Sequence, residues 1–181
     1  MTNKQNPFAV VGIDPGKTTG FFVYAPEGRQ GGFSPGGAKP FMAWQEFDCE
    51  QAPEVLCNEI IDLSERYGHS GVHIAVERFV INARTAKLSQ QPDALEVTGM
   101  VRAFARLHTS NAIRQFMKAN LKFANDAALK HAGWYSSKLG HATDAARQAY
   151  ALLKDVDYPA WLDVSNGKTD AMMKIDDTKR G

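Results

Sequence analysis

The sequence predicts an α/β fold, a mixed five-stranded sheet flanked by helices, and two observations support this prediction. Three short segments rich in β-branched and aromatic residues come first, separated by turn residues. Segments with helical spacing then alternate with two further strand-like segments. Hairpin-connected strands followed by alternating helices and strands are typical of a mixed sheet with helices on its faces. The 181 residues, 44% hydrophobic and 23% charged, suffice for one domain with a complete core.

The predicted strands are short apolar runs bounded by turn residues. The first, residues 7–14, is followed by Pro15 and Gly16, and the second, residues 19–24, begins only a few positions later. Two strands separated by such a short turn indicate a tight hairpin. The other three predicted strands are residues 41–47, 72–76 and 112–116.

Helices are predicted where apolar residues recur every three or four positions. They are residues 53–67, ending at Gly68; 93–107; 125–131, capped by Asn125 and closed by Gly133; and the Ala-rich residues 143–154. Residues 27–40 are rich in Gly and Pro and indicate a flexible loop. The polar residues after 163 lack periodicity. We therefore expect a domain over residues 7–157 and a C-terminal extension, partly disordered, over residues 158–181.

The net charge of +1 conceals an uneven distribution along the chain. Between Arg78 and Lys138 there are ten basic residues and three acidic ones, a net charge of +7, whereas the rest of the chain carries −6. Such a polarised chain can present a basic face to a polyanion such as nucleic acid. The alternative is that these basic residues only cover a solvated helix surface and bind nothing.

Composition also excludes several classes of protein. The chain has only two cysteines, Cys49 and Cys57, whose spacing fits neither a metal site nor a disulfide framework. Its longest apolar runs are far shorter than the roughly 20 residues of a membrane-spanning helix. A carboxylate follows too early for the apolar core of a signal peptide to form. We expect a cytoplasmic protein with no membrane partner.

Three carboxylates occupy positions that folding alone does not favour. Asp14 and Glu77 each end a strand, and Asp144 lies on the inner part of the Ala-rich helix. A carboxylate that is partly desolvated in this way is unfavourable unless it is paired or binds a cation. If the two strands are neighbours, Asp14 and Glu77 converge at one edge, where like charges call for a divalent cation. Simpler explanations are turn amides for Asp14, an ion pair with Arg78 or Arg84 for Glu77, and a helix cap for Asp144.

His141 precedes Asp144 by three residues, so the two side chains share one helix face and could face the same ion. A neutral imidazole combined with hard oxygen ligands suits Mg²⁺ or Mn²⁺. The alternative is that His141 simply stands at the start of the helix, where it caps the helix or faces solvent.

Three motifs resemble those of the RuvC Holliday-junction resolvases, of the RNase H-like superfamily. They are Gly12-Ile13-Asp14-Pro15-Gly16 followed by Thr19-Gly20, Val76-Glu77-Arg78-Phe79, and His141-Ala142-Thr143-Asp144-Ala145-Ala146. The motifs occur in order across residues 8–153. Two departures are His141, which replaces the commoner aspartate, and the position of the aromatic residue at Phe79, with Val80 following. The Gly-rich residues 28–40 resemble the bacteriophage-type branch, which implies a bacterial cell or a phage-infected host.

The resemblance implies an RNase H-like fold and two-metal phosphodiester hydrolysis. Asp14, Glu77, His141 and Asp144 would hold two Mg²⁺ ions, with Mn²⁺ as a substitute, and Lys118 would lie near the scissile phosphate. A homodimer would cut four-way junctions, with flaps and forks as further candidate substrates, leaving 5′-phosphate and 3′-hydroxyl ends. DNA contacts would come from Arg78, Phe79, Arg84, Lys87, Arg102, Arg106 and Lys122.

Two structural questions and three rival functions stay open at this point. Phe79 is either a residue that stacks on an unpaired base or a core aromatic. The apolar stripe of helix 93–107 serves either the core or a dimer interface. The rival functions are an RNase H or YqgF-like nuclease acting on RNA or hybrids, a non-catalytic branched-DNA-binding module, and a sugar-kinase or actin-like ATPase. The length of the chain and the lack of a second phosphate loop disfavour the ATPase.

Overall fold

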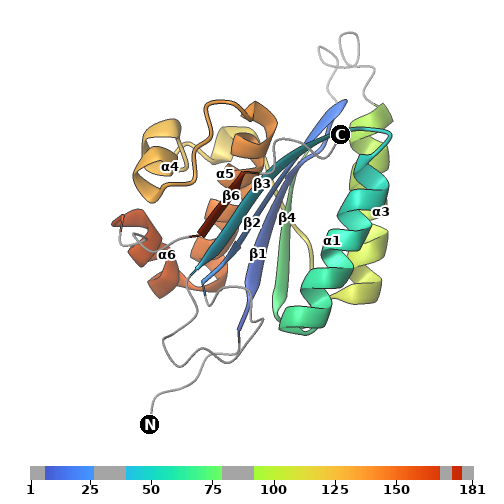
Figure 1. Cartoon of the computed structure of the whole chain (residues 1–181), viewed down its shortest axis with the longest axis horizontal. Helices are drawn as coiled ribbons and strands as arrows, with labels where there is room; N and C mark the ends of the chain where they lie inside the picture. The colour runs from blue at the N-terminus through green and yellow to red at the C-terminus, as the bar shows by residue number, and fades with distance from the viewer. Residues whose placement is uncertain (1–6, 27–39, 79–91, 168–172, 177–181) are drawn as a thin grey trace.

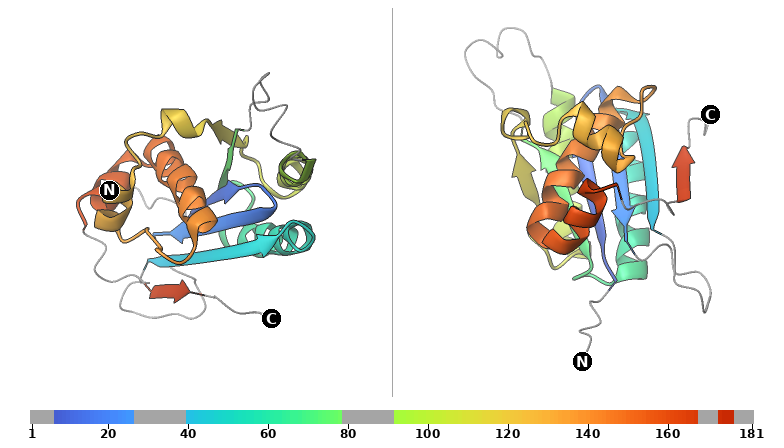
Figure 2. Two further views of the ribbon diagram at one scale, coloured as in Figure 1. Left: turned by 90° about the horizontal axis from the view of Figure 1, so that it is seen from above. Right: turned by 90° about the vertical axis from the view of Figure 1, so that its left-hand side faces the viewer.

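The computed structural model, which describes residues 7–26, 40–78, 92–167 and 173–176, is a mixed sheet between two helical layers (Figures 1 and 2). The predicted α/β class is therefore confirmed. The sheet has the strand order β5-β4-β1-β2-β3-β6. The strands are β1 (Ala9–Asp14), β2 (Thr18–Ala25), β3 (Phe41–Asp48), β4 (Val72–Glu77), β5 (Arg114–Phe116) and β6 (Met173–Asp176). The first five are the predicted strands, and β6 pairs with β3 in parallel at one edge.

Helices cover both faces of the sheet and create two cores. One face carries α1 (Ala52–Tyr67) and α3 (Pro92–His108), and the other carries α4 (Asp126–Ala132), α5 (Gly140–Val156) and α6 (Tyr158–Ser165) (Figure 1). A short 3₁₀ turn, η1 (Lys118–Asn120), follows β5. Because β1 is covered on both faces, all six of its residues are buried, which explains its nearly continuous apolar sequence.

Strand pairing brings the ends of β1 and β4 to the same edge. The two strands are parallel, and Ile13 pairs with Val76. The next residues along each strand, Asp14 and Glu77, therefore end side by side. The predicted convergence of these two carboxylates is confirmed.

The helix α5 lies directly on the backbone of β1 and β2. A Cβ atom built on Gly12 would lie 1.9 Å from the carbonyl oxygen of Ala145, and one built on Gly20 would lie 2.1 Å from the backbone of His141. Such distances are far inside van der Waals contact, so both positions require glycine for steric reasons. The face of α5 that meets the sheet is made of small residues, Ala142, Ala145, Ala146 and Ala149, all fully buried.

Some elements differ from the sequence-based expectations. The helix α5 begins at Gly140 rather than at residue 143, which places His141 in its first turn. The stripe of α3 packs on α1, with Val97 and Val101 buried in the same core as Leu56, so these residues serve the core. Residues 158–181, expected as an extension, contribute α6, whose Val164 is fully buried against α5.

The loop expected over residues 27–40 lies, except for Pro40, outside the described ranges. Within those ranges, no helix combines the length and the apolar character needed to cross a bilayer.

We predict that Gly12→Ala lowers the free energy of unfolding by roughly 1–3 kcal/mol or more, because the added methyl group collides with the backbone of α5. Gly99→Ala is the matched control. Gly99 is exposed on α3 with nothing within 4 Å of an added Cβ, so alanine there should raise the free energy of unfolding by about 0.5–1 kcal/mol. Urea denaturation of both variants measures the two effects, and equal stability of Gly12→Ala and parent would contradict the close contact.

Candidate active site

The first component of the site is the pair of carboxylates at the strand ends. Asp14 is only 8% exposed and Glu77 is half-buried. Burial, a hydrogen bond with Asp14 and the negative charges of Asp14 and Asp144 raise the pKa of Glu77 to about 8, although the nearby Lys118 opposes the shift. The edge of the sheet thus gathers more negative charge than its surroundings neutralise.

The second component is His141, which α5 places against Asp14. The imidazole Nδ1 lies 2.9 Å from Oδ2 of Asp14. The position of this first turn is set by Glu46 on β3, whose Oε1 accepts hydrogen bonds from the backbone N–H groups of His141 (2.7 Å) and Ala142 (3.0 Å). Because Leu139 at the N-cap makes no side-chain cap, Glu46 satisfies amides that the helix itself leaves free.

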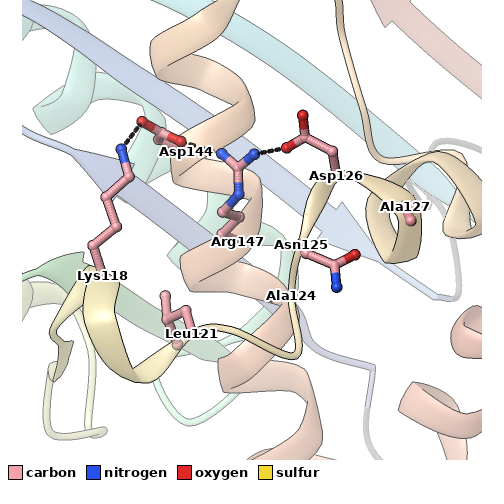
Figure 3. A pocket seen from close by; sticks show the side chains of 8 residues that line it. All are labelled: Lys118, Leu121, Ala124, Asn125, Asp126, Ala127, Asp144 and Arg147. Atoms are coloured by element: carbon pink, nitrogen blue, oxygen red, sulfur yellow. Dashed lines mark hydrogen bonds and ion pairs between the residues drawn. The ribbon is translucent and has the colours of Figure 1, made fainter.

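The third component is a chain of alternating charges that begins at Lys118. The Lys118 ammonium donates to Oδ2 of Asp144, and the Arg147 guanidinium donates both to Oδ1 of Asp144 and to Oδ1 of Asp126 (Figure 3). Partial burial lowers the pKa of Lys118, but its hydrogen bond to Asp144 and the charges of Asp144, Glu77 and Asp14 raise this pKa overall.

The position of Lys118 follows from strand pairing. Glu77 pairs with Phe116 at the end of β5, and the backbone N–H of Arg78 donates to the Phe116 carbonyl at 2.9 Å. Two residues later the chain turns into η1, which begins at Lys118. The lysine is therefore placed at the same edge of the sheet as the carboxylates.

Two hollows meet at this chain of charges. A cleft of about 620 Å³ is lined by Lys118, Leu121, Asp144 and Arg147, among others. A second, of about 380 Å³, includes His141, Asp144 and Arg147 in its wall. The Asp144–Arg147 pair thus lines both hollows, so an extended ligand could contact the pair from either side.

The structure brings together the five predicted catalytic residues, Asp14, Glu77, Lys118, His141 and Asp144, through the contacts described above. The predicted DNA-binding residues divide into three groups. Arg78 and Lys122 are exposed, the first directly after Glu77 and the second next to Leu121 of the cleft.

Two other predicted DNA-binding residues do not gather at the site. Arg102 and Arg106 are exposed on α3. The last turn of α3 leads to Asn111, whose side chain bonds the carbonyls of Ser70 and Val72 at the start of β4. This is the end of β4 opposite Glu77. The remaining predicted residues, Phe79, Arg84 and Lys87, lie in a segment that the structure does not describe.

The side chains of Asp14, Glu77, Asp144 and His141 are of types that can bind a divalent cation. Three carboxylates supply the hard oxygen ligands that Mg²⁺ and Mn²⁺ prefer, and one imidazole adds a neutral nitrogen ligand of intermediate hardness. Burial raises the pKa of Glu77 most, and the neighbouring Asp14 and Asp144 carboxylates, whose charges a cation would offset, raise it further. Among the described residues, no three His, Cys, Asp or Glu side chains are already spaced as metal ligands, since Asp144 is directed toward Lys118 and Arg147.

The fold is similar to that of RuvC from T. thermophilus, solved in complex with a Holliday junction substrate. The match has a TM-score of 0.51 and 15% sequence identity, and it covers 83% of this chain and 96% of that chain. This likeness shows the RNase H-like fold, as the motifs predicted. No family model matches the chain, and no curated protein matches it in sequence.

Sequence reasoning missed three residues of the site. Arg147 stands three residues after Asp144 on α5, a spacing that pairs opposite charges on one helix face and could have revealed it. Glu46 and Asp126 gave no such signal, because each reaches α5 only through the tertiary fold.

We predict that Glu46→Ala lowers the free energy of unfolding by roughly 0.5–2 kcal/mol, because two helix amides lose their acceptor. Hydrogen exchange at the amides of His141 and Ala142 should accelerate in the same variant. Glu46→Gln keeps an acceptor and should lose less, and Glu50→Ala, at an exposed turn position, should change stability by no more than about 0.5 kcal/mol. Unchanged amide exchange in Glu46→Ala would contradict this capping role.

Proposed function

We propose that the protein is a metal-dependent endonuclease that cuts branched DNA and resolves Holliday junctions. The observation that carries the proposal is the meeting of Asp14 and Glu77 from paired strand ends with His141 and Asp144 from one turn of α5. The likeness of the fold to RuvC supports the same class of substrate. A protein that only binds DNA has no use for four convergent acidic and imidazole side chains.

Asp14, Glu77, His141 and Asp144 would hold two Mg²⁺ ions, with Mn²⁺ as a substitute. Such ions supply activation of a water molecule for attack and stabilisation of the departing oxygen. The contribution of the chain is to fix the ligands on rigid elements: Asp14 and Glu77 at the ends of central strands, and His141 in a helical turn that Glu46 caps.

The reaction is hydrolysis of one phosphodiester bond. The water oxygen bonds to phosphorus, the bond between phosphorus and the 3′ oxygen breaks, and a proton from the water ends on that oxygen. The products are a 5′-phosphate and a 3′-hydroxyl. Lys118, exposed at the edge of the cleft, would contact the scissile phosphate.

Binding of DNA would rest on contacts to phosphates, which give affinity that falls with salt and depends little on sequence. Arg78 and Lys122 are the cations best placed for this near the site, and Phe79, Arg84 and Lys87 belong to the same proposal. Arg102 and Arg106, exposed on α3 away from the site, are not part of it. Because a junction must be cut on two strands symmetrically, we include a twofold homodimer with two active sites in the proposal. Its location would be the cytoplasm of a bacterial or phage-infected cell.

A second candidate, an RNase H or YqgF-like nuclease acting on RNA or hybrids, shares the same metal ligands. The RuvC-like order of the three motifs favours DNA junctions over RNA. The two candidates differ in substrate and not in chemistry, so a comparison of substrates separates them.

We predict that the parent protein nicks synthetic four-way junctions at paired positions in the presence of Mg²⁺ or Mn²⁺. Asp14→Asn should lower the cleavage rate by at least about 100-fold, because it removes a ligand charge from the site, while junction binding measured by gel shift persists. Asp62→Asn is the matched control, since Asp62 is a partly exposed carboxylate on α1 whose ion-pair partner among the described residues is Arg66, one helical turn away. Equal cleavage by Asp14→Asn and parent would overturn the catalytic assignment.

We predict, for a panel of four-way junctions, flaps, forks, linear duplex and RNA–DNA hybrid, that four-way junctions are cut fastest and linear duplex slowest. The measurement is the initial rate for each substrate at one salt concentration, because phosphate contacts make affinity depend on salt. Preferential cleavage of the hybrid would instead support the RNase H-like candidate.

A further inference from the structure

The two cations bound to Asp144 differ in how firmly they are held. The side chain of Arg147 is only 16% exposed and bridges two carboxylates, Asp144 and Asp126. The side chain of Lys118 is 59% exposed and pairs only with Asp144 among the ion pairs of the described residues. A planar guanidinium held at both ends is fixed in orientation, whereas a lysine ammonium on a flexible stem exchanges readily with water.

The two cations also occupy different oxygens of the carboxylate. Arg147 binds Oδ1 and Lys118 binds Oδ2. Departure of Lys118 would therefore free one oxygen while the other stays anchored. The charges of Glu77 and Asp14 also act on Lys118, so this ammonium lies near the acidic edge of the sheet.

From this asymmetry we propose that Lys118 is a placeholder cation that neutralises Asp144 until a divalent ion takes Oδ2, and that Arg147 is a positioning residue that holds Oδ1 throughout. The proposal rests on the metal-dependent function proposed above and adds the order of events at one ligand. A divalent ion must displace Lys118, and the released ammonium becomes available to a phosphate of the substrate. Metal binding and phosphate binding at this site are then positively coupled.

The test is a titration of the full-length protein with Mn²⁺ in the absence of DNA, in which the electron paramagnetic resonance signal of unbound Mn²⁺ gives the dissociation constant. Lys118→Met should bind Mn²⁺ at least about 5-fold more tightly than the parent, because the competing cation is gone. Lys122→Met is the matched control, because it removes the same charge at a position four residues along the chain. Among the ion pairs of the described residues, none involves Lys122. It should stay within about twofold of the parent.

A second variant tests the role of Arg147, and here the affinity for Mn²⁺ should fall instead of rise. Arg147→Lys keeps the charge but cannot bridge two carboxylates with one planar group, so Mn²⁺ should bind about 10-fold more weakly. Thermal melting of each variant without metal monitors folding. A change in general electrostatics cannot explain weaker binding in a variant of unchanged charge.

Each outcome of these titrations decides the proposal. The proposal is supported if Lys118→Met binds Mn²⁺ more tightly than the parent, Lys122→Met does not, and Arg147→Lys binds Mn²⁺ more weakly. Equal or weaker binding by Lys118→Met, equal tightening by Lys122→Met, or binding by Arg147→Lys as tight as that of the parent overturns it. If the parent still cleaves junctions in that case, the proposed function stands and only the placeholder role fails. If the parent binds no Mn²⁺ in the absence of DNA, the placeholder role fails, and the junction-cleavage assay decides the proposed function separately.

Discussion

The contact between α5 and the sheet determines where the site forms. Because Gly12 and Gly20 have no side chain and α5 presents alanines, the backbone of the helix lies against β1 and β2. The N-terminal turns of α5 therefore reach the edge where β1 and β4 end, and His141 and Asp144 meet the strand-end carboxylates there. A larger side chain at either glycine would collide with the backbone of α5, and side chains held at hydrogen-bond distance, such as His141 and Asp14, would separate.

The site neutralises its negative charge in three different ways. Glu77 has a raised pKa and so tends to keep a proton, Lys118 pairs with Asp144, and Arg147 bridges Asp144 and Asp126. All three responses follow from one cause, since carboxylates crowded at a partly buried edge are unfavourable unless they are compensated. Of these three, the proton of Glu77 and the exposed ammonium of Lys118 are the ones that the proposed divalent cations would replace.

Local patterns predicted most of the fold and the core of the site. Strand and helix periodicity depends on neighbouring residues, so the five strands and the helices up to α5 were predicted, and the strand-end positions of Asp14 and Glu77 made their convergence predictable. Lys118 was found through the resemblance, because its approach to Asp144 depends on the pairing of β5 with β4. Glu46 and Asp126 could not be found in this way, since nothing in the sequence near either residue indicates that it reaches α5.

The basic stretch between Arg78 and Lys138 is divided by the fold. Arg102 and Arg106 lie on α3, in the helical layer opposite to α4 and α5, whereas Lys118 and Lys122 lie beside the cleft. The charge of +7 in the sequence therefore overstates what one duplex can contact at the site. Of the cations beside the cleft, Lys118 is already bound to Asp144. In the proposed function, a DNA phosphate that recruits this lysine must take it from the carboxylate, so the approach of the DNA backbone and the release of an Asp144 oxygen become one event.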